Sequence, residues 1–239
     1  MTKDNGKLKV SPLLGKGAGM RLILASNSPR RRELLSGLGF EYEVRTLPGL
    51  DESYPDGLSM EEIPQYISRK KASAYTIGPD ELLITADTIV YLDGEVLGKP
   101  ADEAEAKAML RKLSGRTHQV VTGVTLTYLN EELRMKNEES KVNREKPTAA
   151  ANSSLFTLHS SHSFSSVSQV TFAELSEEEI DHYVTHYRPL DKAGAYGIQE
   201  WIGYIGVTRI EGSYFNVMGL PVQKLYSEMK KLNLLPDTI

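Results

Sequence analysis

Asp87 interrupts a run of apolar and β-branched residues at 82–90, whose composition predicts a buried β-strand. Lys99 lies a short way beyond, after an Asp-Gly pair that is typical of a hairpin turn. A carboxylate inside such a strand is costly unless it pairs with a cation or faces a cleft. Asp87 is therefore a candidate general base, a candidate metal ligand or one half of a structural ion pair, and the pattern alone leaves these open.

A second group of residues that could take part in binding or catalysis follows the apolar run 22–25. Ser28 is a favoured N-cap residue, and Pro29 suits the first position of a helix. The free N–H groups and the positive end of that helix would lie at the turn, beside Arg30 and Arg31. This arrangement can bind phosphate. A capped surface helix with solvated arginines is the alternative, and the segment alone leaves it equally open.

The segment 190–221 is unusually rich in glycine. Glycine allows the backbone to approach a ligand closely, but in strands it more often serves bends and bulges. We therefore expect twisted strands for most of this segment. Polar and aromatic side chains lie between the glycines, namely Lys192, Tyr196, Gln199, Tyr204, Ser213, Tyr214 and Asn216.

Alternating strands and helices are expected around these groups. The predicted order is strand, helix, acidic loop, helix, hairpin, helix, strand, insertion, strand, helix, glycine-rich strands and helix, which indicates an α/β domain with a mixed sheet. The first helix should end near Gly37 or Gly39. Further helices are predicted at 60–75, at 101–113, from a capping box of Ser176 and Glu179 to Tyr187, and from Pro221 onward.

Composition limits the classes of protein that fit. The chain has 239 residues, 40% of them hydrophobic and 25% charged, which is enough for one sizeable core and two lobes. A net charge of −4 argues against a nucleic-acid binder with a broad basic surface. Cysteine is absent, which excludes disulfides and thiolate chemistry and fits a reducing cytoplasm. No apolar run is long enough to span a membrane, and the first twenty residues lack the apolar region of a signal peptide.

Over residues 21–234 the chain resembles the Maf-like nucleoside triphosphate pyrophosphatases, also called septum formation inhibitors. The resemblance rests on motifs in the family's order, ASNSPRRREL, ISRKKASAY, ADTIV, GKP, LSGRTHQVVTGV, DKAGAYGIQ and EGSYFNVMGLP. No one motif is decisive, but their ordered occurrence is very specific. The resemblance implies an elongated mixed-sheet α/β fold shared with the ITPase-like pyrophosphatases (Maf/Ham1), with two lobes around a central cleft and frequent homodimers.

The resemblance also implies an activity, the hydrolysis of a nucleoside triphosphate to the monophosphate and pyrophosphate with a divalent metal, Mg²⁺ or Mn²⁺. Asp87 corresponds to the carboxylate that activates water. Phosphate charge would be offset by cationic side chains and by the helix start. Glu52 is a candidate metal ligand with Asp87, although a solvated acidic loop explains it nearly as well. The remaining residues carried over are Lys71 and Lys99 as catalytic lysines, and Ser26, Ser28, Arg30 and Arg31 as phosphate ligands.

Three positions track base preference in the family, and here they are Arg30, Thr88 and Gln199. This set resembles the dTTP and UTP subgroup. A glutamine both donates and accepts, which suits the O4 and N3–H edge of uracil or thymine. Two alternatives stay open, a nucleotide-binding interaction protein in cell-division control with little turnover, and a house-cleaning enzyme for purines such as ITP. The expected partner is a small nucleotide, with neither nucleic acid nor membrane.

The chain departs from the family's pattern at a few places. Residues 131–168 are charged and then rich in Asn, Ser and His, so we predict a mobile surface insertion whose His159 and His162 are solvated. Residues 1–20 are expected to form a flexible tail before a single domain at 21–239. Thr85 stands where relatives usually have glycine and is expected to narrow the cleft slightly. His118 is expected either to bond backbone or to contact substrate.

Overall fold

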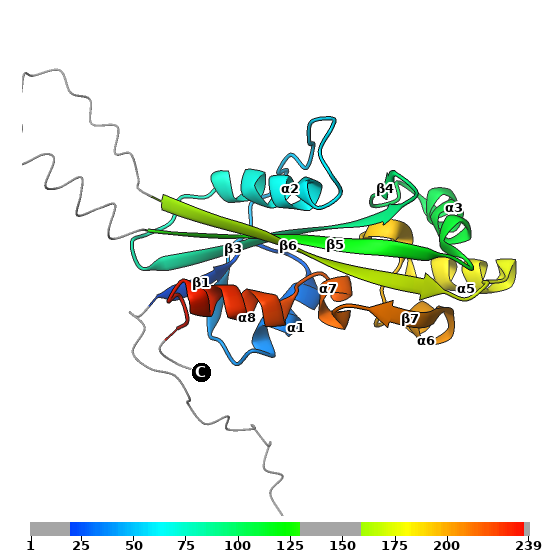
Figure 1. Ribbon diagram of the computed structural model, residues 1–239. Coiled ribbons are helices and arrows are strands. Elements are labelled where there is room, and N and C mark those ends of the chain that lie inside the picture. Colours follow the sequence, from blue (N-terminus) through cyan, green and yellow to red (C-terminus); the bar gives the residue numbers. More distant parts are fainter. Residues whose placement is uncertain (1–19, 130–158, 237–239) are drawn as a thin grey trace, which may run out of the picture.

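A mixed β-sheet runs the length of the molecule (Figure 1). The computed structural model describes residues 20–129 and 159–236. In these ranges the strand order is β2-β1-β3-β5-β6-β7, with β4 paired to β3. β1 pairs in parallel with β2 and β3, and the other pairs are antiparallel. The strands are β1 Arg21–Leu24, β2 Tyr42–Val44, β3 Glu81–Leu92, β4 Glu95–Leu97, β5 Thr117–Leu129, β6 His159–Phe172 and β7 Val207–Glu211.

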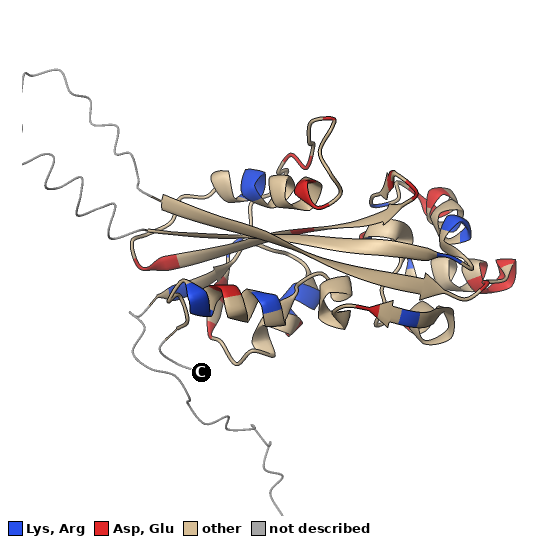
Figure 2. Ribbon diagram, viewed as in Figure 1, with Lys and Arg blue, Asp and Glu red and all other residues tan. Residues whose placement is uncertain are grey.

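Helices cover both faces of the sheet. Helix α2 packs on one face, while α1, α7 and α8 lie on the other; α3 and α5 lie together at the far end (Figure 1). Lys and Arg residues are interspersed with Asp and Glu residues over these helices (Figure 2). The helices are α1 Pro29–Ser36, α2 Glu62–Ser73, α3 Glu103–Leu113, α5 Glu177–Tyr187, α6 Trp201–Gly206, α7 Tyr214–Met218, α8 Val222–Lys231 and the 3₁₀ turn η1 Ala193–Ala195.

Strand β3 is buried on both faces, which explains its nearly continuous apolar sequence. Side chains alternate between faces, so Leu82, Ile84 and Ala86 join the main core, whereas Ile89 packs with Ile63 beneath α2. By the same alternation Asp87 is directed to the α2 side. The alternation along β3 therefore directs the Asp87 carboxylate toward a helix that carries Lys70 and Lys71 in its last turn.

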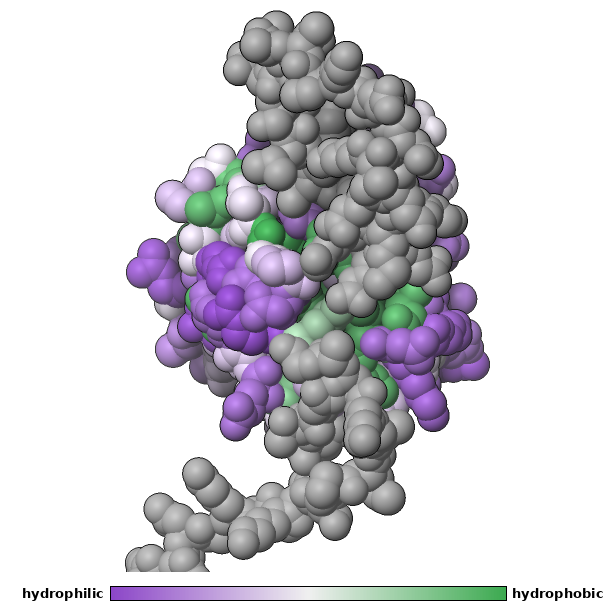
Figure 3. Space-filling view, turned by 90° about the vertical axis from the view of Figure 1, so that its left-hand side faces the viewer, coloured by the Kyte–Doolittle hydropathy of each residue, from purple (hydrophilic) through white to green (hydrophobic). Residues whose placement is uncertain are grey.

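Elements gather into two lobes that share the long strands. One lobe contains β1, β2, α1, α2 and α8, and the other contains β4, α3, α5, η1, α6 and β7 (Figure 1). The α/β class, the mixed sheet and the two lobes are thus as the sequence predicts. At the end of the molecule that faces the viewer in Figure 3, hydrophilic residues flank a smaller group of hydrophobic ones. No helix of residues 20–129 and 159–236 has the length and apolar character needed to cross a membrane.

Local signals in the sequence are confirmed where they depend on short-range geometry. Ser28 caps α1 by accepting a hydrogen bond from the Arg31 amide, and α1 ends at Gly37. Ser176 opens α5 with the predicted capping box. Asp93 and Gly94 turn the β3-β4 hairpin with positive φ values of 49° and 88°. Each of these features is decided by a few adjacent residues.

The prediction of glycine-rich strands for 190–221 is wrong for most of the segment. Only β7 is a strand there, and η1, α6 and α7 are helical turns. The glycines serve close contacts: a Cβ at Gly203 would lie 1.8 Å from the carbonyl oxygen of Ile198. Gly219 ends α7 with φ of 113°. Helical turns packed this tightly need glycine as much as bulged strands do, so composition could not separate the two.

The prediction of a surface insertion at 131–168 is also wrong for its last ten residues. Residues 159–168 belong to β6, which pairs with β5 from His159 to Thr171. His162 contacts a carboxylate oxygen of Glu228 in α8 at 3.0 Å, so it is not simply solvated. The strand is rich in Ser, and hydroxyl pairs such as Thr125 with Ser163 hold it to β5. The rest of the predicted insertion and the tail at 1–19 lie outside the described residues.

Thr85 does not narrow the cleft, contrary to expectation. Its side chain is buried beneath α2 and donates a hydrogen bond to the carbonyl oxygen of Ser68 at 2.8 Å. A glycine at this position would let α2 approach the strand closely. The Thr85 hydroxyl instead links the strand and the helix by a hydrogen bond. Thr85 therefore fastens α2 to β3.

Gly123→Ala is expected to lower the free energy of unfolding by about 3 kcal/mol, because the new Cβ would meet the Pro64 carbonyl carbon of α2 at 2.3 Å. Backbone atoms cannot move aside as a flexible side chain can. Urea denaturation followed by circular dichroism measures the change. Gly98→Ala is the matched control, since a Cβ there meets nothing within 4 Å, and it should change stability by less than about 1 kcal/mol. Equal losses in the two variants would contradict the tight contact of α2 with the sheet.

Candidate active site

A cavity of about 540 Å³ lies between the two lobes. The β1-α1 turn, the loop before α2 and Lys71 of α2 line it from one lobe, and the segment 191–199 lines it from the other. Strand β3 forms its floor. All of the residues that the sequence singled out as catalytic, phosphate-binding, metal-binding or specificity-determining line this cavity: Ser26, Ser28, Arg30, Arg31, Glu52, Lys71, Asp87, Thr88, Lys99 and Gln199. Their roles stay predictions.

The β1-α1 turn presents the start of a helix to the cavity. Strand β1 ends at Leu24, and the Ser26 hydroxyl accepts a hydrogen bond from the Ser28 amide at 3.2 Å. The Ser28 hydroxyl in turn caps α1. Because both serines are fixed by the turn itself, the amides and the positive end of α1 stay directed at the cavity. This is a ready site for an anion.

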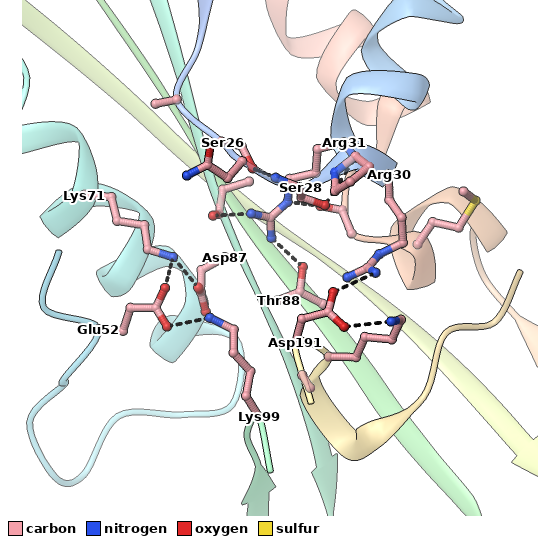
Figure 4. Close-up of a pocket in the computed structure, with 18 of the residues that line it drawn as sticks. Ser26, Ser28, Arg30, Arg31, Glu52, Lys71, Asp87, Thr88, Lys99 and Asp191 are labelled. Carbon is pink, nitrogen blue, oxygen red and sulfur yellow. Dashed lines mark hydrogen bonds and ion pairs between the residues drawn. The ribbon is translucent and has the colours of Figure 1, made fainter. Parts of the chain in front are cut away.

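Two carboxylates and two lysines form an ion-pair cluster opposite this turn (Figure 4). Lys71 Nζ lies 2.7 Å from Asp87 Oδ1 and 2.8 Å from Glu52 Oε1. Glu52 reaches Lys99 with its other oxygen, at 3.0 Å. Asp87 is 8% exposed, whereas Glu52 is partly open to solvent. The cluster joins β3, α2, the loop before α2 and the segment after β4, so one sequence pattern alone could not reveal it.

The two carboxylates fit an oxygen-ligated divalent metal. Asp87 and Glu52 share Lys71 as a neighbour, so their oxygens lie within a few ångströms of each other. Desolvation raises the pKa of Glu52, but hydrogen bonds and charge from Lys71 and then Lys99 outweigh it and lower the pKa to about 2. Within the described ranges no group of three or more His, Cys, Asp or Glu residues gathers as a ligand set. A metal here would need ligands from the substrate as well, as Mg²⁺ commonly does.

Arg31 connects three segments of the cavity wall. Its guanidinium donates to the carbonyl oxygens of Gly219 at 2.8 Å and Ala86 at 2.9 Å, and to the Thr88 hydroxyl at 3.0 Å. The Thr88 hydroxyl also contacts that of Thr122 at 2.9 Å. Burial lowers the pKa of Arg31, and the charge of Asp87 offsets part of this. Arg31 thus links α1 to β3 and to the end of α7, in addition to any contact that it makes with phosphate.

Gln199 lies at the other end of the cavity. In the part of the chain that the structure describes, its Oε1 atom is buried and has no hydrogen-bond partner. A buried acceptor without a partner is costly, so it marks a place where a ligand donor is expected. Tyr196 forms part of the wall nearby, and its hydroxyl contacts His118 Nε2 at 2.7 Å. His118 is buried, and desolvation lowers its pKa to about 4. Among the described residues its side chain bonds to Tyr196 and not to backbone, contrary to one expectation, and it is not one of the residues that line the cavity.

Asp191 and Lys192 are cavity residues to which sequence reasoning assigned no role. Lys192 is 8% exposed and contacts Asp191 at 2.7 Å and Glu200 at 3.2 Å. Asp191 also reaches Arg30 at 3.4 Å. The adjacent Asp and Lys at the start of the glycine-rich segment were the available signal, because a charged pair inside an apolar and glycine-rich run needs partners.

The fold and the site together define an α/β protein with a cleft between two lobes, in which a helix start and two lysines lie near one buried carboxylate. The sequence model described as "Maf-like protein" matches residues 21–232. The chain belongs to this Maf-like family.

Relatives in this family are similar over almost their full length. A protein of Phocaeicola vulgatus named dTTP/UTP pyrophosphatase is 59% identical over 214 residues, which cover 89% of this chain and 96% of that protein. A protein of Bacteroides thetaiotaomicron with the same name is 55% identical over 222 residues, which cover 92% of this chain and 100% of that protein.

A comparison with solved structures finds a chain from Mycobacterium abscessus, titled nucleoside-triphosphatase / dITP/XTP pyrophosphatase. It has a TM-score of 0.33 and 15% sequence identity, and the match covers 72% of this chain and 97% of that one.

Proposed function

We propose that this protein hydrolyses dTTP and UTP to the monophosphate and pyrophosphate. The observation that carries the proposal is the cavity in which Asp87, Lys71 and Lys99 face the N-terminus of α1. Relatives that are 59% and 55% identical and bear the name dTTP/UTP pyrophosphatase support the substrate class. The site combines the two things that this reaction needs, cationic groups for a triphosphate and a carboxylate for water.

In the proposed complex the triphosphate lies between the α1 start and the lysines. Ser26 and the backbone amides beside Ser28 donate to phosphate oxygens, while the Ser28 amide stays bonded to the Ser26 hydroxyl and Arg30 adds positive charge. Lys71 and Lys99 offset the charge that develops on the leaving pyrophosphate. For this, the phosphates must compete with Glu52 for both lysines.

Asp87 is the proposed proton acceptor. A water held in hydrogen-bond reach of its carboxylate attacks the α-phosphorus, the bond from that phosphorus to the bridging oxygen breaks, and pyrophosphate leaves. The proton of the water passes to Asp87. Lys71 pairs with the same carboxylate, since its ammonium lies 2.7 Å from Asp87 Oδ1.

Glu52 and Asp87 are the residues proposed to hold Mg²⁺ or Mn²⁺. Such an ion, when bound, neutralises phosphate charge and orients the phosphates. The ionised state of Glu52 is consistent with this role, because its pKa is lowered to about 2. Chelation with EDTA is expected to remove turnover while circular dichroism stays unchanged.

Base selectivity is assigned to Gln199, Arg30 and Thr88. The unpartnered Oε1 of Gln199 would accept the N3–H of uracil or thymine, while its amide group donates to O4. Arg30 is held near this end of the cavity by Asp191, and Thr88 by Arg31. Cytosine presents the reverse pattern at both atoms, so this pairing predicts discrimination between UTP and CTP.

Gln199→Glu is expected to lower kcat/KM for dTTP and UTP by roughly 10- to 100-fold, because an ionised carboxylate cannot donate to O4. Turnover of purine triphosphates should change much less. The measurement is pyrophosphate release across nucleotides. Gln223→Glu, on the exposed part of α8 and bonded to Ser227, is the matched control and should leave all rates unchanged. Equal loss for every nucleotide would mean that Gln199 supports the site without reading the base.

The direct test of the proposed function is pyrophosphate release from a panel of nucleoside triphosphates with Mg²⁺ or Mn²⁺. Release from dTTP and UTP is expected to exceed release from CTP, ATP, GTP and ITP. Strongest release from ITP would favour the purine house-cleaning alternative. A folded protein that binds nucleotides but releases no pyrophosphate would instead be a binding or regulatory protein.

The proposal also includes a cellular compartment and an oligomeric state. We place the enzyme in the cytoplasm, where its nucleotide substrates are made and where a chain without cysteine is unremarkable. The resemblance favours a homodimer. Light scattering after size exclusion measures its mass directly, and a monomer at micromolar concentration would contradict the dimer.

A further inference from the structure

Residues 197–200 form a tight turn that carries Gln199 into the cavity. The Glu200 amide donates to the Gly197 carbonyl oxygen at 2.9 Å, which closes the turn. Space inside it is minimal, since a Cβ at Gly197 would lie 2.8 Å from the Glu200 side chain and 3.1 Å from Gln199 Nε2. The direction of the Gln199 amide therefore depends on how this turn is held.

Tyr183 of α5 contacts both ends of the turn. Its hydroxyl accepts a hydrogen bond from the Gly197 amide at 3.0 Å and donates one to Glu200 Oε2. The other Glu200 oxygen contacts Lys192 at 3.2 Å. Tyr183 is fully buried, and its ring stacks on Tyr187 with centroids 5.1 Å apart, so its position is fixed by packing. One rigid hydroxyl thus joins the first and last residues of the turn.

We propose that Tyr183 is a positioning residue for base selectivity, which clamps the turn at 197–200 and fixes the orientation of the Gln199 amide. This inference rests on the proposed function of Gln199 and extends it to a helix outside the cavity. An amide can present its oxygen and nitrogen in either order by rotating half a turn. A firmly held turn keeps the order that suits uracil and thymine, whereas a loose turn also accepts cytosine.

Tyr183→Phe tests the clamp by removing only the hydroxyl. The ratio of kcat/KM for UTP to that for CTP is expected to fall roughly tenfold, mainly through a higher KM for UTP, as when one buried hydrogen bond is lost. The value of kcat for UTP should change less than threefold, because Asp87 and its lysines are untouched. Tyr187→Phe is the matched control, since this neighbouring ring is 40% exposed, and it should keep the ratio of the unmodified protein.

Glu200 provides a second, independent pair of variants. Glu200→Gln keeps an oxygen that can accept from Tyr183 and is expected to retain most of the UTP preference, whereas Glu200→Ala should lose it as Tyr183→Phe does. Melting temperatures check that each variant is folded. If Tyr183→Phe proves unstable, the Glu200 pair decides the question, because its side chain lies partly in solvent.

The outcomes separate this inference from the function beneath it. An unmodified protein that releases no pyrophosphate from UTP would overturn the proposed function. An unmodified protein that prefers UTP, with Tyr183→Phe equally selective or slower on UTP and CTP alike, would overturn the clamp alone. A selective loss in Tyr183→Phe and Glu200→Ala, with Glu200→Gln spared, supports it.

Discussion

Asp87→Asn is expected to lower kcat for dTTP and UTP by about 10³-fold, which is within the usual range for a general base. The amide has nearly the shape of the carboxylate, so it should keep the strand and the cavity intact. It cannot take up a proton from water, and it pairs more weakly with Lys71, 2.7 Å away. Single-turnover pyrophosphate release at saturating dTTP measures the loss. Nucleotide binding by calorimetry should stay within a few fold of the unmodified protein.

The matched control for this substitution is Asp93→Asn. Asp93 lies in the β3-β4 turn with φ of 49°, a conformation that asparagine also accepts readily. It is outside the residues that line the cavity. Turnover should therefore be unchanged in this variant. If Asp87→Asn keeps full turnover, the carboxylate of Asp87 is not the base, and Glu52 becomes the next residue to replace.

Lys71→Gln is expected to lower kcat/KM by roughly 10²- to 10³-fold, comparable to removing one preorganised group that stabilises transition-state charge. Lys71 contacts Asp87 and Glu52 together, so its removal leaves two neighbouring carboxylates without their shared cation. Against desolvation, which raises it, Lys71 is the largest influence that lowers the pKa of Glu52 to about 2, so loss of Lys71 raises that pKa. Because Glu52 must be ionised to fill its proposed role, the acidic limb of the kcat/KM profile should move to higher pH, and the defect should be largest in acid.

Lys70→Gln is the control for this effect. Lys70 is adjacent in α2 but points to Asp51, at 2.6 Å, and to Ser53, away from the cavity. Its loss should change neither the rate nor the pH profile by more than about twofold. A pH profile of Lys71→Gln that is lowered uniformly, with no shift of its acidic limb, would mean that Lys71 contacts phosphate without lowering the pKa of Glu52.

Short-range features of this protein could be predicted from its sequence, and long-range ones could not. The cap at Ser28, the turn at Gly94 and the capping box of α5 each depend on a few adjacent residues. The resemblance supplied the site residues, and all of them line one cavity. The pairing of Lys71 with Asp87 depends on α2 crossing β5 against Gly123, a contact between segments far apart in the chain. No local pattern encodes that crossing.

Errors in the prediction have physical causes as well. Glycine in 190–221 was assigned to strands because both a bulged strand and a tightly packed helical turn require the absence of a Cβ. The polar sequence of β6 suggested a loop, yet hydroxyl pairs across to β5 satisfy its side chains. The proposed role of Tyr183 has no signal in the sequence, since an aromatic residue on a helix most often only fills the core.

Asp87 and Thr88 are consecutive on β3, so their side chains leave opposite faces of the strand. Asp87 contacts Lys71 on the α2 side, whereas Thr88 contacts Arg31 and Thr122 on the other. The proposed chemistry and the proposed recognition of the base therefore use separate sets of neighbours. If these proposed roles hold, substitutions at Thr88 or Gln199 are expected to shift which nucleotide is consumed while the reaction itself is preserved, which would let this scaffold diversify its substrates over evolution.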